Sequence, residues 1–197
     1  FFFETMSTYQ VFYHTACKGF YGRALAAVQM LEEAGKPYEC KEAGDFTAKA
    51  FAPPMIETPA GAKCGQTTAI AIVLGQELGY SPSDPAAFAK ACQLVADSSD
   101  LFSDVSGGKD DERIKKWLQH FEDNLSGKFF CGDSLSFADF NCFMIFTGVS
   151  QMKAALMGGY PKVNAWIETM RALPSSEKLK ATGVPFVPES MGGWKLL

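Results

Sequence analysis

Two short stretches of this chain carry groups that could hold a peptide-like ligand. Pro53-Pro54-Met55 joins a proline pair to a short apolar segment. A cis X-Pro bond there would turn the backbone of Met55 toward a ligand, which could pair with it as an added strand. Gln66-Thr67 opens an apolar run, where free N–H groups and the helix dipole favour a carboxylate. The ordinary alternatives are a rigid turn for the first stretch and a helix cap for the second.

Tyr13 and Cys17 are the candidates for sulfur chemistry. Tyr13 ends the first predicted strand, where its hydroxyl could donate a hydrogen bond to a thiolate. A charge-assisted hydrogen bond of roughly 1.5–3 kcal/mol would lower the pKa of that thiol by about one to two units. Cys17 lies in the following loop beside Lys18, which could lower the pKa of its own thiol. The alternatives are simple packing for Tyr13 and an inert loop thiol for Cys17.

The chain up to Tyr80 is predicted to form an α/β unit that would position these groups. Strands are predicted at 9–13, 38–41 and 55–56, and helices at 22–34 and 67–78. Gly35 and Gly79 follow the two helices and are typical helix stops. This order predicts a small mixed sheet with helices on both faces.

The segment 81–85, Ser-Pro-Ser-Asp-Pro, is typical of a linker and divides the chain into predicted domains at 9–80 and 86–197. No strand is predicted after it. Ser136 and Asp139 match a variant capping box. The tail from Gly183 is rich in proline and glycine and is predicted to be irregular. Helices are predicted at 85–105, 110–125, 136–157, 160–172 and 176–181, the last capped by Ser175-Ser176.

Composition narrows the classes of function. Hydrophobic residues make up 47% of the 197 residues, enough for a substantial core, and the net charge of −4 argues against nucleic acid as a partner. No apolar run approaches the roughly 18 residues of a membrane span. Six cysteines without a Cys-x-x-Cys pair and only two histidines make a metal site improbable and favour free thiols in the cytoplasm. No helix or strand is predicted for residues 1–5.

Several motifs, in order and spacing, resemble the cytosolic glutathione transferases of the Tyr-type (sigma-, mu- and pi-like) classes over roughly 9–181. The resemblance implies a thioredoxin-like domain that binds glutathione, an all-helical domain that binds a hydrophobic electrophile, and a homodimer. The motifs are Gly22-Arg23-Ala24, Gly35-Lys36-Pro37-Tyr38-Glu39, Pro53-Pro54-Met55-Ile56, Gln66-Thr67-Thr68-Ala69-Ile70, the segment 132–139, and Tyr160-Pro161-Lys162-Val163-x-x-Trp166.

The same resemblance implies roles for individual residues. Tyr13 would activate the glutathione thiol. The glutathione contacts that the resemblance implies are Met55 (backbone, to the cysteinyl part), Gln66 and Thr67 (γ-glutamyl end), Asp97 (γ-glutamyl amine, across the dimer interface) and Lys49 (glycyl carboxylate). Lys41 is a second, weaker candidate for that carboxylate.

The loop between Tyr13 and Gly22 is longer than in the Tyr-type pattern. It could reshape the pocket, displace Tyr13, or bring Cys17 or Tyr21 into its place. We therefore expect glutathione conjugation activated by Tyr13, with two alternatives. These are a glutathione thiol transferase that depends on Cys17, and a non-catalytic ligand-binding protein of the same fold. Side chains that could wall the electrophile site, and that core packing explains equally well, are Phe102, Phe143, Met152 and Trp194.

Overall fold

The computed structural model describes residues 8–197, so residues 1–5 lie outside the described part. Its first half is a four-stranded sheet in the order β2-β1-β3-β4. β1 (Tyr9–Tyr13) runs parallel to β2 (Tyr38–Glu42), and β3 (Met55–Glu57) runs antiparallel to both β1 and β4 (Lys63–Gly65). The parallel β1–β2 pair requires a crossover, which α1 (Leu25–Glu33) supplies after a 3-10 turn. β4 has only three residues and no apolar alternation, and the sequence analysis missed it.

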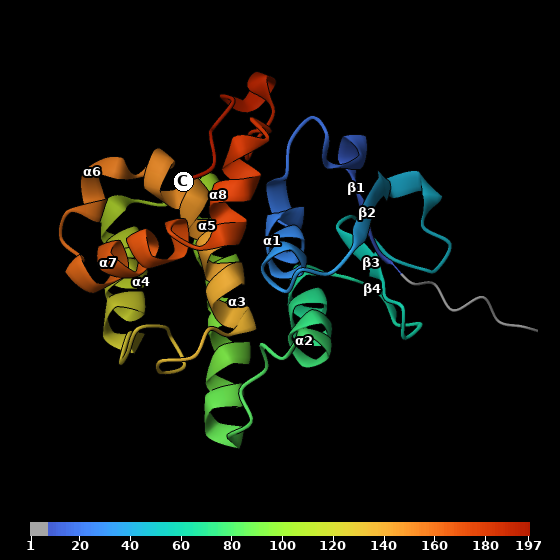
Figure 1. Cartoon of the computed structure of the whole chain (residues 1–197). Coiled ribbons are helices and arrows are strands. Elements are labelled where there is room, and N and C mark those ends of the chain that lie inside the picture. The colour runs from blue at the N-terminus through green and yellow to red at the C-terminus, as the bar shows by residue number, and fades with distance from the viewer. Residues whose placement is uncertain (1–7) are drawn as a thin grey trace, which may run out of the picture.

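The expectation of helices on both faces of the sheet is wrong. α1 and α2 (Thr67–Leu78) lie on the same face, between the sheet and the helical half of the molecule (Figure 1). Within residues 8–197, the opposite face carries the short 3-10 helix η3 (Ala43–Asp45) and its flanking loops, where Phe46 packs on Phe12 with ring centroids 5.1 Å apart. Between β2 and β3 the structure has η3 and no α-helix.

The second half is all helical, as predicted, and is built around α5 (Phe137–Met152), every residue of which is buried from Phe137 to Val149. The predicted helix 136–157 is interrupted at Lys153, and the last helix begins at Pro174 without a serine cap. None of the helices in the described part is long and apolar enough to cross a bilayer. The other helices are α3 (Pro85–Ser106), α4 (Asp111–Asn124), α6 (Ala154–Met157), α7 (Pro161–Arg171) and α8 (Pro174–Ala181).

The predicted capping box at the start of α5 is present and extends into a larger network. Asp139 is fully buried and its Oδ2 accepts the Ser136 N–H at 2.9 Å and the Ser136 hydroxyl at 2.6 Å. Its Oδ1 accepts the Phe130 N–H at 3.0 Å and the Trp166 indole N–H at 3.1 Å. One carboxylate thus joins the loop before α5, α5 itself and α7.

The two halves of the molecule meet where α2 packs against the start of α5. Gly75 makes this approach possible, because a Cβ at this position would lie 2.6 Å from Cδ1 and 3.0 Å from Cβ of Phe137. Phe137 is itself fully buried. The side chain of Phe137 therefore takes the space that any other residue at position 75 would need.

Replacing Gly75 with alanine should lower the free energy of unfolding by about 1–3 kcal/mol, because the methyl group overpacks the contact with Phe137. Helix propensity alone would stabilise the protein by about 1 kcal/mol, so the sign of the change separates the two effects. Urea denaturation measures the difference. Gln76→Ala, on the exposed face of the same helix, is the matched control and should change stability by less than about 0.5 kcal/mol. A stabilised Gly75→Ala protein would mean that α2 and α5 are not closely packed.

Candidate functional site

Strand register brings the predicted site residues to one end of the sheet. Phe12 pairs with Met55, so Tyr13 is next to Pro54 at the ends of their strands. Met55 in turn pairs with Gly65, which places the start of α2 beside the same end. Three segments that are far apart in the sequence thus meet at this end of the sheet.

A backbone hydrogen bond and two aromatic contacts hold Tyr13 at this end of the sheet. Its side chain is buried, and its hydroxyl oxygen accepts a hydrogen bond from the Arg23 backbone N–H at 3.1 Å. The rings of His14 and Phe20 make edge-on contacts with it at centroid distances of 5.0 and 5.5 Å. The longer loop therefore surrounds Tyr13 and leaves its hydroxyl at the end of β1, where the sequence analysis placed it.

Burial raises the pKa of the Tyr13 hydroxyl, and the hydrogen bond from Arg23 offsets only part of this rise. The phenol is therefore neutral near pH 7 and keeps its proton. Because the Arg23 N–H occupies one lone pair of the oxygen, the O–H remains free to donate to an anion. This is the property required of a group that stabilises a thiolate.

The loop after Tyr13 adopts an uncommon backbone. Thr15, Ala16 and Cys17 have φ values of 51°, 47° and 58°, in the left-handed region that non-glycine residues rarely occupy. The turn is closed by hydrogen bonds from the N–H groups of Lys18 and Gly19 to the carbonyl and hydroxyl oxygens of Thr15, at 2.8 and 3.0 Å. Sequence patterns do not reveal this conformation, because none of the three residues is a typical left-handed residue.

The C-terminal tail fixes the end of this loop, a contact that the sequence analysis missed. The N–H groups of Tyr21 and Gly22 donate to the carbonyls of Pro185 and Phe186 at 3.0 and 2.7 Å. The Tyr21 hydroxyl lies 3.3 Å from that of Thr182, at the end of α8. Tyr21 is thus engaged with the helical half and does not take the place of Tyr13.

Cys17, the alternative nucleophile, is buried. An interaction with the Cys40 thiol, together with burial, raises the pKa of the Cys17 thiol. A thiol of raised pKa carries little thiolate at neutral pH. The geometry therefore disfavours Cys17 as the group that attacks first. All six cysteines are free thiols.

The bond between Pro53 and Pro54 is cis, as the sequence analysis proposed. Met55 itself lies between β1 and β4, and a strand with neighbours on both sides directs its backbone polar groups at those neighbours. The contacts therefore do not support the expected pairing of Met55 with a ligand. At the cis turn neither proline has an N–H, so Pro53 could offer a ligand only its carbonyl.

α2 begins at Thr67 and ends before the left-handed Gly79, as predicted. Gln66 occupies the N-cap position with φ 72° and ψ 124°, and no side chain of the described residues caps the helix there. The first helical hydrogen bond runs from Ile70 N–H to the Gln66 carbonyl at 2.9 Å. The N–H groups of the first turn, beginning with Thr67, thus have no intrahelical acceptor, and they lie at the same end of the sheet as Tyr13. Binding of a carboxylate there stays a prediction.

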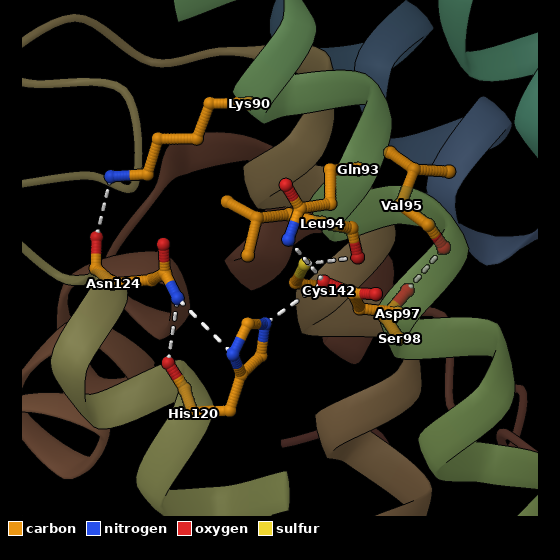
Figure 2. Close-up of polar contacts among 9 residues, drawn as sticks. All are labelled: Lys90, Gln93, Leu94, Val95, Asp97, Ser98, His120, Asn124 and Cys142. Atoms are coloured by element: carbon orange, nitrogen blue, oxygen red, sulfur yellow. Dashed lines mark hydrogen bonds and ion pairs between the residues drawn. The ribbon is translucent and has the colours of Figure 1, made fainter.

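Asp97 points into its own chain. Its Oδ2 lies 2.9 Å from Nε2 of His120 on α4 and accepts from the Gln93 side-chain amide at 3.2 Å (Figure 2). Asn124 donates to the His120 carbonyl at 2.9 Å, which extends the network along α4. The predicted contact of Asp97 across a dimer interface would have to compete with these bonds, and it remains a prediction.

The two lysines differ in what they can offer a ligand. Lys41 forms an ion pair with Glu39 at 3.5 Å, whereas Lys49 is exposed in the loop before the cis peptide bond. The role of Lys49 at the glycyl carboxylate stays a prediction.

The four expected wall residues do not line one pocket. Phe143 is buried among helices against Trp166, and Met152 is exposed on the surface. Phe102 lies near the candidate site, because the Arg23 guanidinium stacks over its ring at 5.6 Å. Trp194 is part of the tail, where its carbonyl accepts the Phe186 N–H at 2.6 Å.

A family model matches the helical half of the chain. Residues 106–180 match the family model described as glutathione S-transferase, C-terminal domain. A probable glutathione S-transferase GSTF1 of Oryza sativa subsp. japonica is 41% identical over 76 residues, which span 38% of this chain and 35% of that protein. The match thus covers about a third of the rice relative.

Solved structures share the fold over nearly the whole chain. The glutathione S-transferase of Ascaris lumbricoides superposes with a TM-score of 0.73 at 21% identity, over 92% of this chain and 99% of that one. Prostaglandin synthase D of Nilaparvata lugens gives 0.68 at 20% identity, over 87% and 96%. Monomeric Na-GST-3 of Necator americanus gives 0.69 at 21% identity, over 89% and 97%. The thioredoxin-like and helical halves are therefore arranged as in glutathione transferases.

Proposed function

We propose that the chain belongs to the glutathione transferase family and that it conjugates the glutathione thiolate to a small hydrophobic electrophile. The observation that carries this proposal is the strand register, which brings Tyr13, the cis-proline turn and the N-terminus of α2 together at one end of the sheet. A donor for a sulfur anion, an acceptor for a peptide N–H and an anion site are what glutathione would require there.

Each part of glutathione has a candidate partner. The γ-glutamyl carboxylate would bind the first turn of α2, with Gln66 and the Thr67 hydroxyl beside it. The N–H of the cysteinyl residue would donate to the Pro53 carbonyl. Lys49 would meet the glycyl carboxylate. Because the prolines supply no N–H, the ligand backbone forms one hydrogen bond at the cis turn in place of two.

Tyr13 would act on the sulfur. Its O–H donates to the thiolate, which lowers the pKa of the bound thiol and raises the fraction present as the nucleophile at neutral pH. The thiolate then attacks the electrophile, and the leaving group departs with the bonding electrons. Binding both reactants at one edge adds the advantage of proximity.

Retention on glutathione-agarose together with turnover of an activated aryl halide tests this proposal. Elution by free glutathione and glutathione-dependent release of halide are the expected results. A protein that is not retained and turns over none of several electrophiles would instead be a non-catalytic ligand-binding protein of this fold. Glutathione-dependent disulfide reduction lost in Cys17→Ser, with conjugation unchanged, would support the thiol transferase alternative.

Gly22→Ala should lower kcat/KM for conjugation at least about tenfold, equivalent to about 1.4 kcal/mol of transition-state stabilisation. A Cβ at this position would lie 2.3 Å from the Tyr13 hydroxyl oxygen, so the tyrosine would have to move. Steady-state kinetics measures the change. Gly35→Ala is the matched control, because Gly35 also has a positive φ but no atom within 4 Å of its added methyl group. Equal activity losses in the two variants would assign the effect to backbone strain and not to Tyr13.

We also propose that the protein forms a homodimer, as the family resemblance implies. Phe51 is 98% exposed in the loop before the cis-proline turn, and a second copy that covered it would remove a large apolar side chain from water. Sedimentation equilibrium should give twice the chain mass for the native protein and a weaker dimer for Phe51→Ser. A monomer at all concentrations would contradict the proposal and would agree with the monomeric hookworm structure.

A further inference from the structure

A short stretch of backbone joins the Tyr13 hydroxyl to the C-terminal tail. The Gly22 N–H donates to the Phe186 carbonyl at 2.7 Å, and the Tyr21 N–H donates to the tail one residue earlier at 3.0 Å. The next N–H group, that of Arg23, donates to the Tyr13 hydroxyl at 3.1 Å. Gly22 itself passes so close that a Cβ on it would lie 2.3 Å from the hydroxyl oxygen. Because packed interiors transmit small displacements, a shift of the tail at this point would move the hydroxyl.

Phe186 anchors this part of the tail on α5. Its side chain is only 2% exposed, and Gly148 leaves the space that its ring fills, because a Cβ at position 148 would lie 3.1 Å from Cε1 of Phe186. A second bond fastens the tail to the same helix, from the side-chain amide of Gln151 to the Lys195 carbonyl at 3.0 Å. The position of the Phe186 carbonyl is therefore set by how its ring packs against α5.

The side chain of Arg23 is tied to the same aromatic contact. Its guanidinium lies over the ring of Phe102, on α3, at 5.6 Å from the ring centroid. The Phe102 ring in turn borders Gly148, since an added Cβ there would lie 3.1 Å from its Cε2. A change at position 148 thus reaches the segment beside Tyr13 by two routes, through the tail and through Phe102.

We propose that Phe186 is a positioning residue for the thiol-activating hydroxyl, since it holds Gly22 and Arg23 where they direct the Tyr13 O–H at the glutathione sulfur. This inference rests on the proposed conjugation by Tyr13. Any residue at position 186 supplies the same backbone carbonyl, so the ring matters because it fixes where that carbonyl lies. Placement is worth a large factor in rate, because a misplacement of about 1 Å can cost on the order of 100-fold.

Two variants displace this anchor in opposite ways. Phe186→Ala removes the ring, whereas Gly148→Ala keeps it and adds a methyl group 3.1 Å from its Cε1. In Phe186→Ala, kcat/KM for an activated aryl halide should fall about tenfold or more, and the pKa of the bound thiol, read from the pH–rate profile, should rise by about one unit. Gly148→Ala should move both quantities in the same direction, and Phe186→Leu should recover most of the loss. Circular dichroism establishes folding, and Gly148→Ala decides the question if Phe186→Ala does not fold.

Phe146→Ala is the matched control. Phe146 is a fully buried phenylalanine of α5, but its ring packs on Phe121 and Trp166 at centroid distances of 5.3 and 5.6 Å. This variant should lose stability and keep the pH–rate profile of the wild-type protein. An equal pH shift in Phe146→Ala would assign the effect to general loosening of the helical half and would overturn the proposal.

Combination with Tyr13→Phe separates positioning from other effects on activity. Once the hydroxyl is absent, adding Phe186→Ala should change kcat/KM by less than about twofold, whereas independent sites would multiply their losses. Multiplied losses would therefore also overturn the proposal.

Amide hydrogen exchange followed by NMR reports the same contacts without catalysis. The Gly22 and Arg23 amides should exchange at least about tenfold faster in Phe186→Ala and Gly148→Ala, and at the wild-type rate in Phe146→Ala. Unchanged protection of the Arg23 amide would overturn the positioning role whatever the activity. A wild-type protein that turns over no electrophile would instead reject the conjugation proposal, so the two can fail separately.

Discussion

Replacing Tyr13 with phenylalanine should lower kcat/KM for conjugation of an activated aryl halide tenfold or more. The variant keeps the ring contacts with His14 and Phe20 and removes only the hydroxyl, which accepts from Arg23 and is free to donate to sulfur. A lost charge-assisted hydrogen bond of roughly 1.5–3 kcal/mol corresponds to about one to two pKa units for the bound thiol. The pH–rate profile should therefore move to higher pH by about that amount, because the thiolate forms later.

Tyr21→Phe is the control for this prediction. Tyr21 is a second buried tyrosine of the same loop, but its hydroxyl lies beside Thr182 and away from the candidate sulfur position. We expect its kinetics and pH profile to stay close to those of the wild-type protein. Unchanged activity in Tyr13→Phe, or a large loss confined to Tyr21→Phe, would remove Tyr13 from the mechanism.

Replacing Asp139 with alanine should have the largest effect on stability, a loss of at least about 3 kcal/mol in the free energy of unfolding. The substitution leaves four buried donors without their acceptor, namely two backbone N–H groups, the Ser136 hydroxyl and the Trp166 indole. Because domains are typically stable by only about 5–15 kcal/mol, much of the protein could fail to accumulate in folded form. Soluble yield and urea denaturation together measure the effect.

Asp133→Ala is the matched control for this second prediction. Asp133 lies in the same loop and accepts the Lys128 N–H at 3.2 Å, but it is exposed, so water replaces the lost bond. Its effect should stay below about 1 kcal/mol. Equal losses in the two variants would mean that the buried network around Asp139 contributes nothing beyond a local cap.

The sequence predicted those parts of the fold that local chemistry specifies. The limits of α2, the cis bond at Pro54 and the capping box at Ser136 and Asp139 each depend on neighbouring residues, and the structure has all three. A mixed sheet followed by an all-helical half was predicted from the order of the elements and was also confirmed. Tyr13 lies at the end of β1 because strand and loop signals are local as well.

The remaining features depend on contacts between distant segments. The bonds of Tyr21 and Gly22 to the tail join residues that no spacing rule connects. The direction of Asp97 depends on which face of α3 meets α4, and a polar residue near the boundary fits either side. β4 was missed because three residues are too few for a periodic pattern, and it forms only as a partner for β3.

The most direct test of the central claim is the position of the sulfur in a crystal structure with bound glutathione. We predict that the sulfur lies within about 3.2 Å of the Tyr13 hydroxyl oxygen, the normal limit of a hydrogen bond. The γ-glutamyl carboxylate should lie at the first turn of α2, beside Thr67. A sulfur that is closer to Cys17, to Cys40 or to the Tyr21 hydroxyl than to Tyr13 would contradict the account.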